Sequence, residues 1–360
     1  MQSSLTSLDI RKTARNAALR ALKKTGAFHM ARRAHRFRLR ILAYHGVWNA
    51  DDGFPGDAMF IRPDTFRRRM ELLAHWGYRV VSLEEGLRLS LSGLAEDAVV
   101  ITVDDGWSTM DSYLWPTLKS LSYPATLYVD TAHLLAREPL VHVMAKYLGR
   151  LLACGQIRMR ADSPQPASKA SSAIASLLEQ ARQRHRPVAE RLELLRAWAA
   201  ILNVDLQHYL ERRVFEYVNG ETLRAMSDSG LDVQLHTHGH SLGDFGFQTV
   251  QREIETNRRI LSELCDVPPQ TLSHFCYPSG RSSAKAVPVF KALGIRSATL
   301  TAPGLACARS NPYFLPRILD GDHMTDLHFE AELCGLVPWL RKSRPAGSAR
   351  LPLGPLRDPV

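Results

Sequence analysis

Two adjacent carboxylates follow a run of apolar residues in the segment Val99 to Gly106, which reads VVITVDDG. The run is rich in β-branched side chains and has no polar alternation, a pattern that predicts a strand buried on both faces. Gly106 allows the chain to turn away after this strand. We therefore expect Asp104 and Asp105 at the carboxyl end of an interior strand, where α/β folds carry their chemistry.

Neighbouring side chains on a strand point in different directions, so the two acids can have separate roles. One can bind a metal ion while the other moves a proton. A plainer interpretation stays open for this motif taken alone, because Asp105 could start the turn and Asp104 could cap a helix.

A cluster of histidines forms a second candidate site, at residues 236–240, which read HTHGH and follow a short apolar run. His236 and His240 are four residues apart and would share a face if the turn after the strand is helical. Two imidazoles and one carboxylate are a common ligand set for a divalent hydrolytic metal, and Asp105 is the natural third ligand. His238 falls out of phase with the other two, so we do not expect it to be a ligand.

Alternating strands and helices surround both motifs, which predicts a parallel sheet or barrel with helices outside. Asp64 is expected to cap a helix over residues 64–76, and Ser82 with Glu85 to form a capping box for the next helix. Further helices are expected around residues 112–121 and 220–229. Strands other than the one described above are expected at residues 38–47, 78–83, 124–130, 231–235, 272–277, 296–301 and 315–319.

The chain outside this alternation differs in composition. A helical insertion is predicted at about residues 135–215, with helices at 137–152 and 189–202 around a linker-like stretch at 163–175. The chain is therefore expected to divide into a basic N-terminal segment, a body that carries the insertion, and a loose Pro- and Arg-rich tail, at residues 1–38, 39–340 and 341–360.

The net charge of +10 lies in the N-terminal segment. Residues 1–50 hold eleven basic residues, from Arg11 to Arg40, and one acid, Asp9, which together give +10. Basic amphipathic helices over residues 8–38 can lie on an anionic membrane, pack on the body with a solvated face, or contact nucleic acid. All three stay open, but no DNA-reading motif is present, so we expect no nucleic-acid partner.

The remaining composition is that of a globular protein. No apolar run approaches the roughly 20 residues of a membrane helix, and the N-terminus lacks the apolar core of a signal peptide. We therefore expect a cytoplasmic location, with peripheral contact at the inner face of the membrane. The five cysteines are scattered without CxxC spacing, which argues against a disulfide framework or a Cys-ligated zinc site.

With TVDDG at 102–106 and HTHGH at 236–240, the chain resembles the polysaccharide deacetylases, the NodB-homology family of carbohydrate esterases (family four). The usual forms of these motifs are T-F-D-D-G and H-[ST]-x-x-H. The phrases ILAYHGV, FCYPSG and LPRI are similar to the branch that contains the poly-N-acetylglucosamine deacetylases. The resemblance covers roughly residues 39–135 and 214–335, and it implies a distorted (β/α)7 TIM-like barrel.

The resemblance also implies roles for the two motifs. By motif position, Asp105, His236 and His240 would hold a divalent metal, and Asp104 would be the general base. Zinc is the default metal, although such a site also accepts cobalt, nickel or manganese.

Three further residues are carried over from the family pattern. His45 would be the general acid, Tyr277 would line the acetyl pocket and offer a backbone N–H, and Arg317 would orient the base. The chain departs from the pattern at Val103, where phenylalanine is usual, and at Ser279, where an aromatic residue is common. Neither departure removes a ligand, but both could change the sugar or acyl group accepted.

The resemblance implies a hydrolase that acts on carbon–nitrogen bonds other than peptide bonds. Its substrate would be an acetylated sugar of a polysaccharide or of a lipid-linked glycan precursor, with N-acetyl groups favoured over O-acetyl groups. The alternative is a catalytically inactive barrel that binds glycan or acts as a scaffold in exopolysaccharide synthesis. The complete set of two aspartates and two histidines argues against this alternative.

Overall fold

A computed structural model of the chain describes residues 7–50, 59–153, 179 and 187–342. The predictions for the linker-like stretch at 163–175, and for the tail beyond residue 342, lie outside the described residues.

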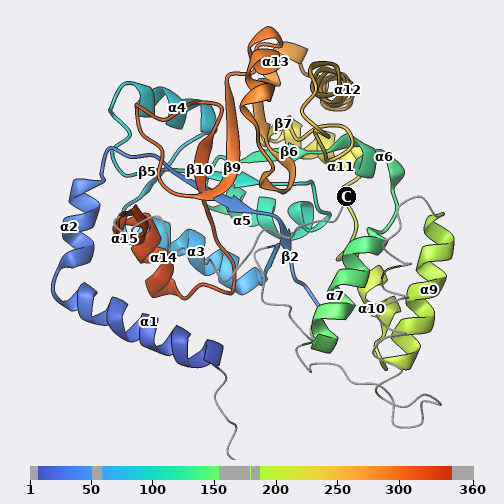
Figure 1. The fold of residues 1–360 in the computed structure, drawn as a ribbon, viewed down its shortest axis with the longest axis horizontal. Helices are drawn as coiled ribbons and strands as arrows, with labels where there is room; N and C mark the ends of the chain where they lie inside the picture. The colour runs from blue at the N-terminus through green and yellow to red at the C-terminus, as the bar shows by residue number, and fades with distance from the viewer. Residues whose placement is uncertain (1–6, 51–58, 154–178, 180–186, 343–360) are drawn as a thin grey trace, which may run out of the picture.

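Seven parallel strands of the described chain close into a barrel (Figure 1). Strand β1 pairs with both β5 and β10 and so closes the ring. The predicted distorted seven-stranded barrel is confirmed. In order around the ring the strands are β1 (Arg40–Tyr44), β5 (Ala98–Val103), β6 (Thr126–Val129), β7 (Asp232–Leu235), β8 (His274–Cys276), β9 (Ser297–Pro303) and β10 (Leu315–Leu319).

Strand β5, which leads to the two aspartates, is buried along its whole length. It pairs with β1 on one edge, and on the other edge with β4 (Arg79–Val80) at its start and β6 at its end. Such a strand has no solvent-facing side, which explains its uniformly apolar sequence. A separate short pair, β2 (Gly46–Val47) and β3 (Phe60–Ile61), follows β1.

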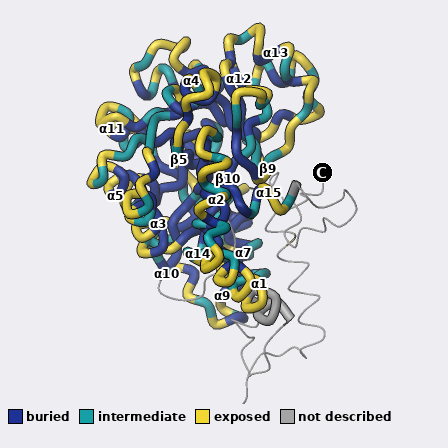
Figure 2. Tube along the Cα trace, turned by 90° about the vertical axis from the view of Figure 1, so that its left-hand side faces the viewer, coloured by how far each residue is buried: buried dark blue, intermediate teal, exposed yellow. Residues whose placement is uncertain are grey.

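Helices surround the barrel, and Figure 2 shows buried residues along the strands and exposed residues on the outer helices. They are α3 (Pro63–His75), α4 (Leu83–Leu91), a π-helix at Met110–Leu114, α5 (Trp115–Ser120), α6 (Thr131–Ala136), α11 (Gly220–Asp228), α12 (Phe247–Cys265), α13 (Val287–Ala292), α14 (Asp326–Leu333) and α15 (Leu336–Lys342). Short 3-10 turns lie at Pro269–Thr271, Pro278–Gly280 and Ala284–Ala286.

One of the two predicted N-caps is wrong. Asp64 is not the cap of α3, because the helix begins at Pro63 with Arg62 in the extended N-cap position. Proline favours the first helical position, so it sets the start one residue earlier. At α4 the Ser82 hydroxyl accepts a hydrogen bond from the Glu85 N–H (3.2 Å), as expected for a cap. The Glu85 carboxylate pairs with Arg88 (2.8 Å).

The predicted helical insertion contains α7 (Val141–Ala153), α9 (Val188–Ile201) and α10 (Leu206–Glu211), which lie together on one side of the barrel in Figure 1. Its aromatic residues pack around Trp48, which follows β2. The ring of Trp48 lies 4.5 Å from Tyr147, 5.6 Å from Tyr209 and 5.9 Å from Phe215, measured between centroids. The insertion is therefore joined to the barrel by a shared apolar core.

The basic N-terminal segment forms α1 (Ser7–Lys24) and α2 (Ala27–Ala34). Leu19 and Phe28 are buried in a small cluster with residues of α14 and α15, so one face of this segment packs on the body. Its other face stays exposed, including Met30 (69% exposed) and Phe37 (43% exposed). Among the described residues, none of the helices combines the length and the apolar character that crossing a bilayer requires.

The described cysteines carry free thiols. They are Cys265, Cys276, Cys307 and Cys334, of which only Cys307 is partly exposed. Cys154 lies outside the described residues.

A fully buried arginine joins α3 to the end of the barrel. Arg69 Nε lies 3.1 Å from Asp320 Oδ2, and both side chains are buried. Tyr44 at the end of β1 donates its hydroxyl to the same carboxylate (2.9 Å), and the guanidinium lies over the ring of Phe329. Burial raises the pKa of Asp320 despite the opposing charge of Arg69. Each charge in this pair therefore depends on the other for its stability.

Replacing Arg69 with methionine should lower the free energy of unfolding by about 3–5 kcal/mol, because Asp320 is left buried without its cation. The matched control is Arg68→Met, which removes an exposed arginine paired with the half-exposed Asp326, a carboxylate that Arg69 also contacts, and should cost below about 1 kcal/mol. Urea denaturation of both variants measures the difference. Equal and small losses would show that the buried pair does not hold α3 in place.

Candidate active site

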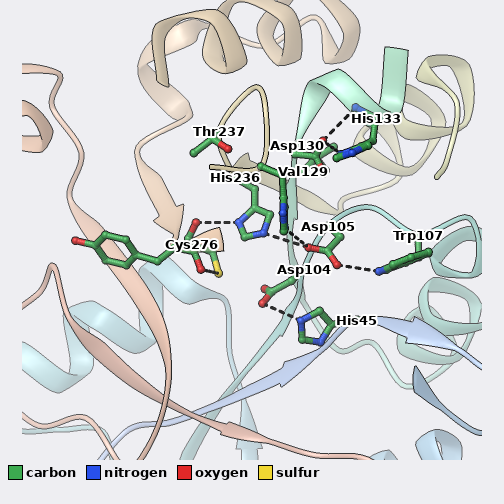
Figure 3. Close-up of polar contacts among 12 residues, drawn as sticks. His45, Asp104, Asp105, Trp107, Val129, Asp130, His133, His236, Thr237 and Cys276 are labelled. Carbon is green, nitrogen blue, oxygen red and sulfur yellow. Dashed lines mark hydrogen bonds and ion pairs between the residues drawn. The ribbon is translucent and has the colours of Figure 1, made fainter. Parts of the chain in front are cut away.

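The three predicted metal ligands converge after the carboxyl ends of β5 and β7. Figure 3 shows two of them, Asp105 and His236, pointing toward each other. Asp105 Oδ1 lies 3.2 Å from Nε2 of His236 and 3.2 Å from Nε2 of His240. One ligand atom from each residue lies within 4.8 Å of the others. More than one hundred residues of chain separate Asp105 from the two histidines, and the closed barrel brings them together.

The two histidines do not meet through a helical turn, which is the condition under which their spacing would place them on one face. Residues 236–240 form no helix. Thr237 (φ 69°) and His240 (φ 55°) adopt left-handed backbone conformations, which bend the chain sharply after β7. The bend is held by Glu253 of α12, whose carboxylate accepts the Gly239 N–H (2.6 Å). Strained residues of this kind persist where the surrounding structure fixes them.

Asp105 is held as a carboxylate. Burial opposes its ionisation, but hydrogen bonds from His236 and His240 outweigh this effect and hold the pKa of Asp105 well below its usual range. Its second oxygen accepts a hydrogen bond from the Trp107 indole (2.9 Å). The carboxylate therefore turns one oxygen toward both imidazoles.

This geometry fits a divalent cation. His236 Nδ1 lies 2.8 Å from the Cys276 carbonyl and donates to it, which leaves Nε2 for a ligand bond. Each imidazole can donate to Asp105 Oδ1 only with a proton on Nε2, and a cation can take the place of these protons. One carboxylate oxygen and two imidazole nitrogens suit zinc, cobalt, nickel or manganese.

A buried asparagine supports His236. Asn257 of α12 accepts the His236 backbone N–H (3.0 Å) and donates to the Val129 carbonyl (3.0 Å) and the Thr131 hydroxyl (3.2 Å). One amide thereby links the ends of β6 and β7. His238, which is not expected to be a ligand, lies apart from the triad with its Nδ1 2.9 Å from the Thr131 hydroxyl.

Asp104 faces a different partner from its neighbour. Arg317 of β10 forms a bidentate pair with its two oxygens, at 2.7 and 2.6 Å, inside the barrel. Burial opposes ionisation of Asp104, but the Arg317 guanidinium outweighs it and holds the pKa of Asp104 below its usual range. This bidentate contact is the geometry expected if Arg317 orients Asp104, as the resemblance implies.

His45 follows β1 and lies beside the same carboxylate. Its Nε2 is 3.7 Å from Asp104 Oδ2 (Figure 3). The other ring nitrogen, Nδ1, is buried and has no hydrogen-bond partner within the described chain. The structure therefore brings six of the seven predicted residues into one group, namely His45, Asp104, Asp105, His236, His240 and Arg317.

Tyr277 is the exception. Its backbone N–H donates to the Thr299 carbonyl (3.2 Å) as part of the pairing between β8 and β9. This bond corrects the expectation that the N–H serves the acetyl pocket, because a donor used in strand pairing is not free for a substrate. The ring of Tyr277 is buried and stacks on Phe314, and burial raises the pKa of its hydroxyl.

Sequence reasoning missed four residues beside this group. Trp107 and Asn257 support the ligands, and Asp130 and His133 form a hydrogen-bonded pair next to them. Asp130 directly follows β6, so the argument that selected Asp104 could have found it as well. No local pattern distinguishes Asn257 from other polar residues of α12.

Replacing His236 or His240 with alanine should weaken zinc binding at least 100-fold, because each removes one of three ligands. His238→Ala is the matched control from the same motif and should bind zinc as the unmodified chain does. Titration calorimetry with zinc measures all three. An equal loss in His238→Ala would contradict this assignment of ligands.

The sequence from residue 204 to 298 matches the family model described as polysaccharide deacetylase. No curated protein shows significant similarity to the chain.

Several solved structures share the fold. The Streptococcus pyogenes deacetylase PplD in complex with acetate is 18% identical, with a TM-score of 0.54, over 82% of this chain and 98% of that chain. A de-N-acetylase from Aggregatibacter actinomycetemcomitans is 15% identical, with a TM-score of 0.51, over 82% of this chain and 99% of that chain. IcaB from Ammonifex degensii is also 15% identical, with a TM-score of 0.50, over 82% of this chain and 97% of that chain.

At these identities the structural likeness shows the fold, and the activity class rests on the family model. Together they confirm the predicted resemblance to the polysaccharide deacetylases. The family model supports the predicted class of hydrolases that act on carbon–nitrogen bonds other than peptide bonds.

Proposed function

We propose that this chain is a metal-dependent deacetylase that removes N-acetyl groups from a sugar of a polysaccharide or of a lipid-linked glycan precursor. One observation carries the proposal. Two adjacent aspartates have separate partners: Asp105 faces His236 and His240, while Asp104 is held by Arg317. At the end of one strand, Asp105 would thus belong to a cation site and Asp104 would be a separate proton acceptor.

Asp105, His236 and His240 would hold the cation, with zinc as the default and cobalt, nickel or manganese as alternatives. When bound, a divalent cation polarises an acetyl carbonyl and lowers the pKa of water. The chain's own residues then have to place the substrate and move two protons.

Asp104 would accept the proton of the attacking water. A general base must be ionised before the reaction begins, and the pairing with Arg317 favours that state. The bidentate contact also fixes the orientation of both carboxylate oxygens. Arg317 would thereby act through Asp104 as a positioning residue.

His45 would donate a proton to the leaving nitrogen. An amine leaves poorly unless it is protonated as the carbon–nitrogen bond breaks. His45 Nε2 lies 3.7 Å from Asp104 Oδ2, so the proposed proton donor and proton acceptor are neighbours. Base and acid would thus sit side by side at the ends of β5 and β1.

Two neighbours in fold support the choice of an acetyl substrate. One is a deacetylase solved with acetate, and another is a de-N-acetylase. The alternative, a barrel that binds glycan without turnover, is not favoured, because the proposed cation ligands, base and acid lie in one group.

The chain should release acetate from N-acetylglucosamine oligomers, and Asp104→Asn should lower kcat at least 1000-fold because no other base replaces it. Chelation should abolish acetate release, and separate additions of zinc, cobalt, nickel and manganese should restore it to different degrees. Measurement of free acetate with each metal checks this result.

The control for Asp104→Asn is zinc binding, which should be unchanged because Asp105 and the imidazoles remain. Oligomer binding without acetate release from the unmodified, metal-loaded chain would favour the glycan-binding alternative.

We also propose that α1 and α2 contact the anionic inner face of a membrane, at a cytoplasmic location. Residues 13–40 contain no acidic residue, and Arg33 and Arg36 are exposed. Exposed Met30 and Phe37 accompany them. Basic side chains beside exposed apolar ones are typical of segments that lie on anionic lipid.

The full chain should float with vesicles that contain phosphatidylserine and not with vesicles of phosphatidylcholine alone. The combined change Met30→Ser, Arg33→Glu and Arg36→Glu should abolish flotation, whereas Arg252→Glu with Arg259→Glu, on exposed positions of α12, should not. A salt-sensitive gel shift with DNA, together with no flotation, would instead support a nucleic-acid partner.

A further inference from the structure

A second carboxylate–imidazole pair lies beside the proposed cation site (Figure 3). Asp130 directly follows β6 and is fully buried. Its Oδ1 accepts two hydrogen bonds from His133, one from the backbone N–H (3.2 Å) and one from ring Nδ1 (2.7 Å). The proposed reaction uses neither residue.

The contact with Asp130 determines which atom of the ring remains for a ligand. A carboxylate only accepts, so Nδ1 of His133 carries the proton that it donates. Nε2 of the same ring has no hydrogen-bond partner within the described chain. The His133 side chain is 21% exposed, so solvent or a bound molecule can reach it.

Ring contacts place His133 at the edge of the site. Its ring centroid lies 6.2 Å from that of the ligand His240 and 5.4 Å from that of Tyr217. Tyr217 in turn contacts Trp107, whose indole holds Asp105. His133 and His240 are partly exposed, at 21% and 20% of their side chains, whereas Tyr217 and Trp107 are buried.

Capping of α6 alone does not explain Asp130. A serine or threonine hydroxyl can cap a helix without the cost of burying a charge. Asp130 Oδ2 has no hydrogen-bond partner in the part of the chain that the structure describes. All described hydrogen bonds of this carboxylate therefore go to His133.

We propose that His133 binds the substrate through Nε2, by a hydrogen bond to a hydroxyl group of the sugar whose acetyl group lies at Asp105, His236 and His240. A hydroxyl both donates and accepts, so it can pair with this nitrogen in either protonation state. Asp130 acts through His133 as a positioning residue. This inference rests on the proposed deacetylase function.

The test measures KM and kcat for acetate release from an N-acetylglucosamine oligomer. His133→Ala should raise KM about tenfold, equal to 1.4 kcal/mol, and leave kcat within about threefold, because the lost bond serves binding. His133→Gln should restore most of the affinity. Asp130→Ser keeps a capping hydroxyl and should raise KM as His133→Ala does.

His75→Ala, an exposed histidine at the end of α3, is the control and should change neither constant. Zinc binding of His133→Ala should match that of the unmodified chain. An unchanged KM in His133→Ala, or a loss of zinc that accounts for the whole effect, would overturn the inference.

Calorimetry of oligomer binding in the Asp104→Asn background separates this inference from the proposed function. If the unmodified chain binds oligomer but releases no acetate, the proposed function fails, and the binding measurement alone tests the inference about His133. A tenfold loss on adding His133→Ala then supports the inference, and no loss overturns it. If the chain neither binds oligomer nor releases acetate, both proposals fail.

Discussion

The ion pair between Asp104 and Arg317 is the contact on which the candidate site depends. It crosses the barrel interior from β5 to β10, and both side chains are buried. Burial of two charges is unfavourable unless their geometry and further hydrogen bonds compensate for lost hydration. Here the contact is bidentate, and Arg317 also donates to the Leu300 carbonyl and the Thr102 hydroxyl. With Asp104 held in this way, Asp105 is free to face the two imidazoles.

Much of this arrangement could be predicted from local patterns. The uniformly apolar run before Asp104 indicates a strand with no solvent-facing side, and β5 has neighbours on both edges along its length. Parallel strands of one barrel end at the same rim, so polar residues after two such strands are expected to meet. The motif resemblance adds the pairing of Asp105 with His236 and His240, which local patterns alone only suggest.

The remaining features depend on contacts that no local pattern reveals. The spacing of His236 and His240 would bring the rings together in a helical turn, but left-handed backbone at Thr237 and His240 bends the chain there instead. Nothing in the sequence indicates that the Tyr277 N–H is already hydrogen-bonded, yet it donates to the Thr299 carbonyl of the neighbouring strand β9. In each case a distant partner decides the conformation, and the sequence near the residue carries no record of that partner.

The buried amide of Asn257 has a consequence for how α12 and the barrel can move. Its side chain hydrogen-bonds to the His236 N–H after β7, the Val129 carbonyl at the end of β6 and the Thr131 hydroxyl at the start of α6. An apolar residue of similar volume would remove the acceptor of the His236 N–H and a donor to the Val129 carbonyl, at roughly 1–3 kcal/mol each, while the Thr131 hydroxyl would keep its contact with His238. Any sliding of α12 along the barrel must therefore break these bonds and displace His236 at the same time. The outer helix α12 and His236 are therefore coupled through these bonds, so a perturbation on the molecular surface at α12 can alter the geometry of the proposed cation site.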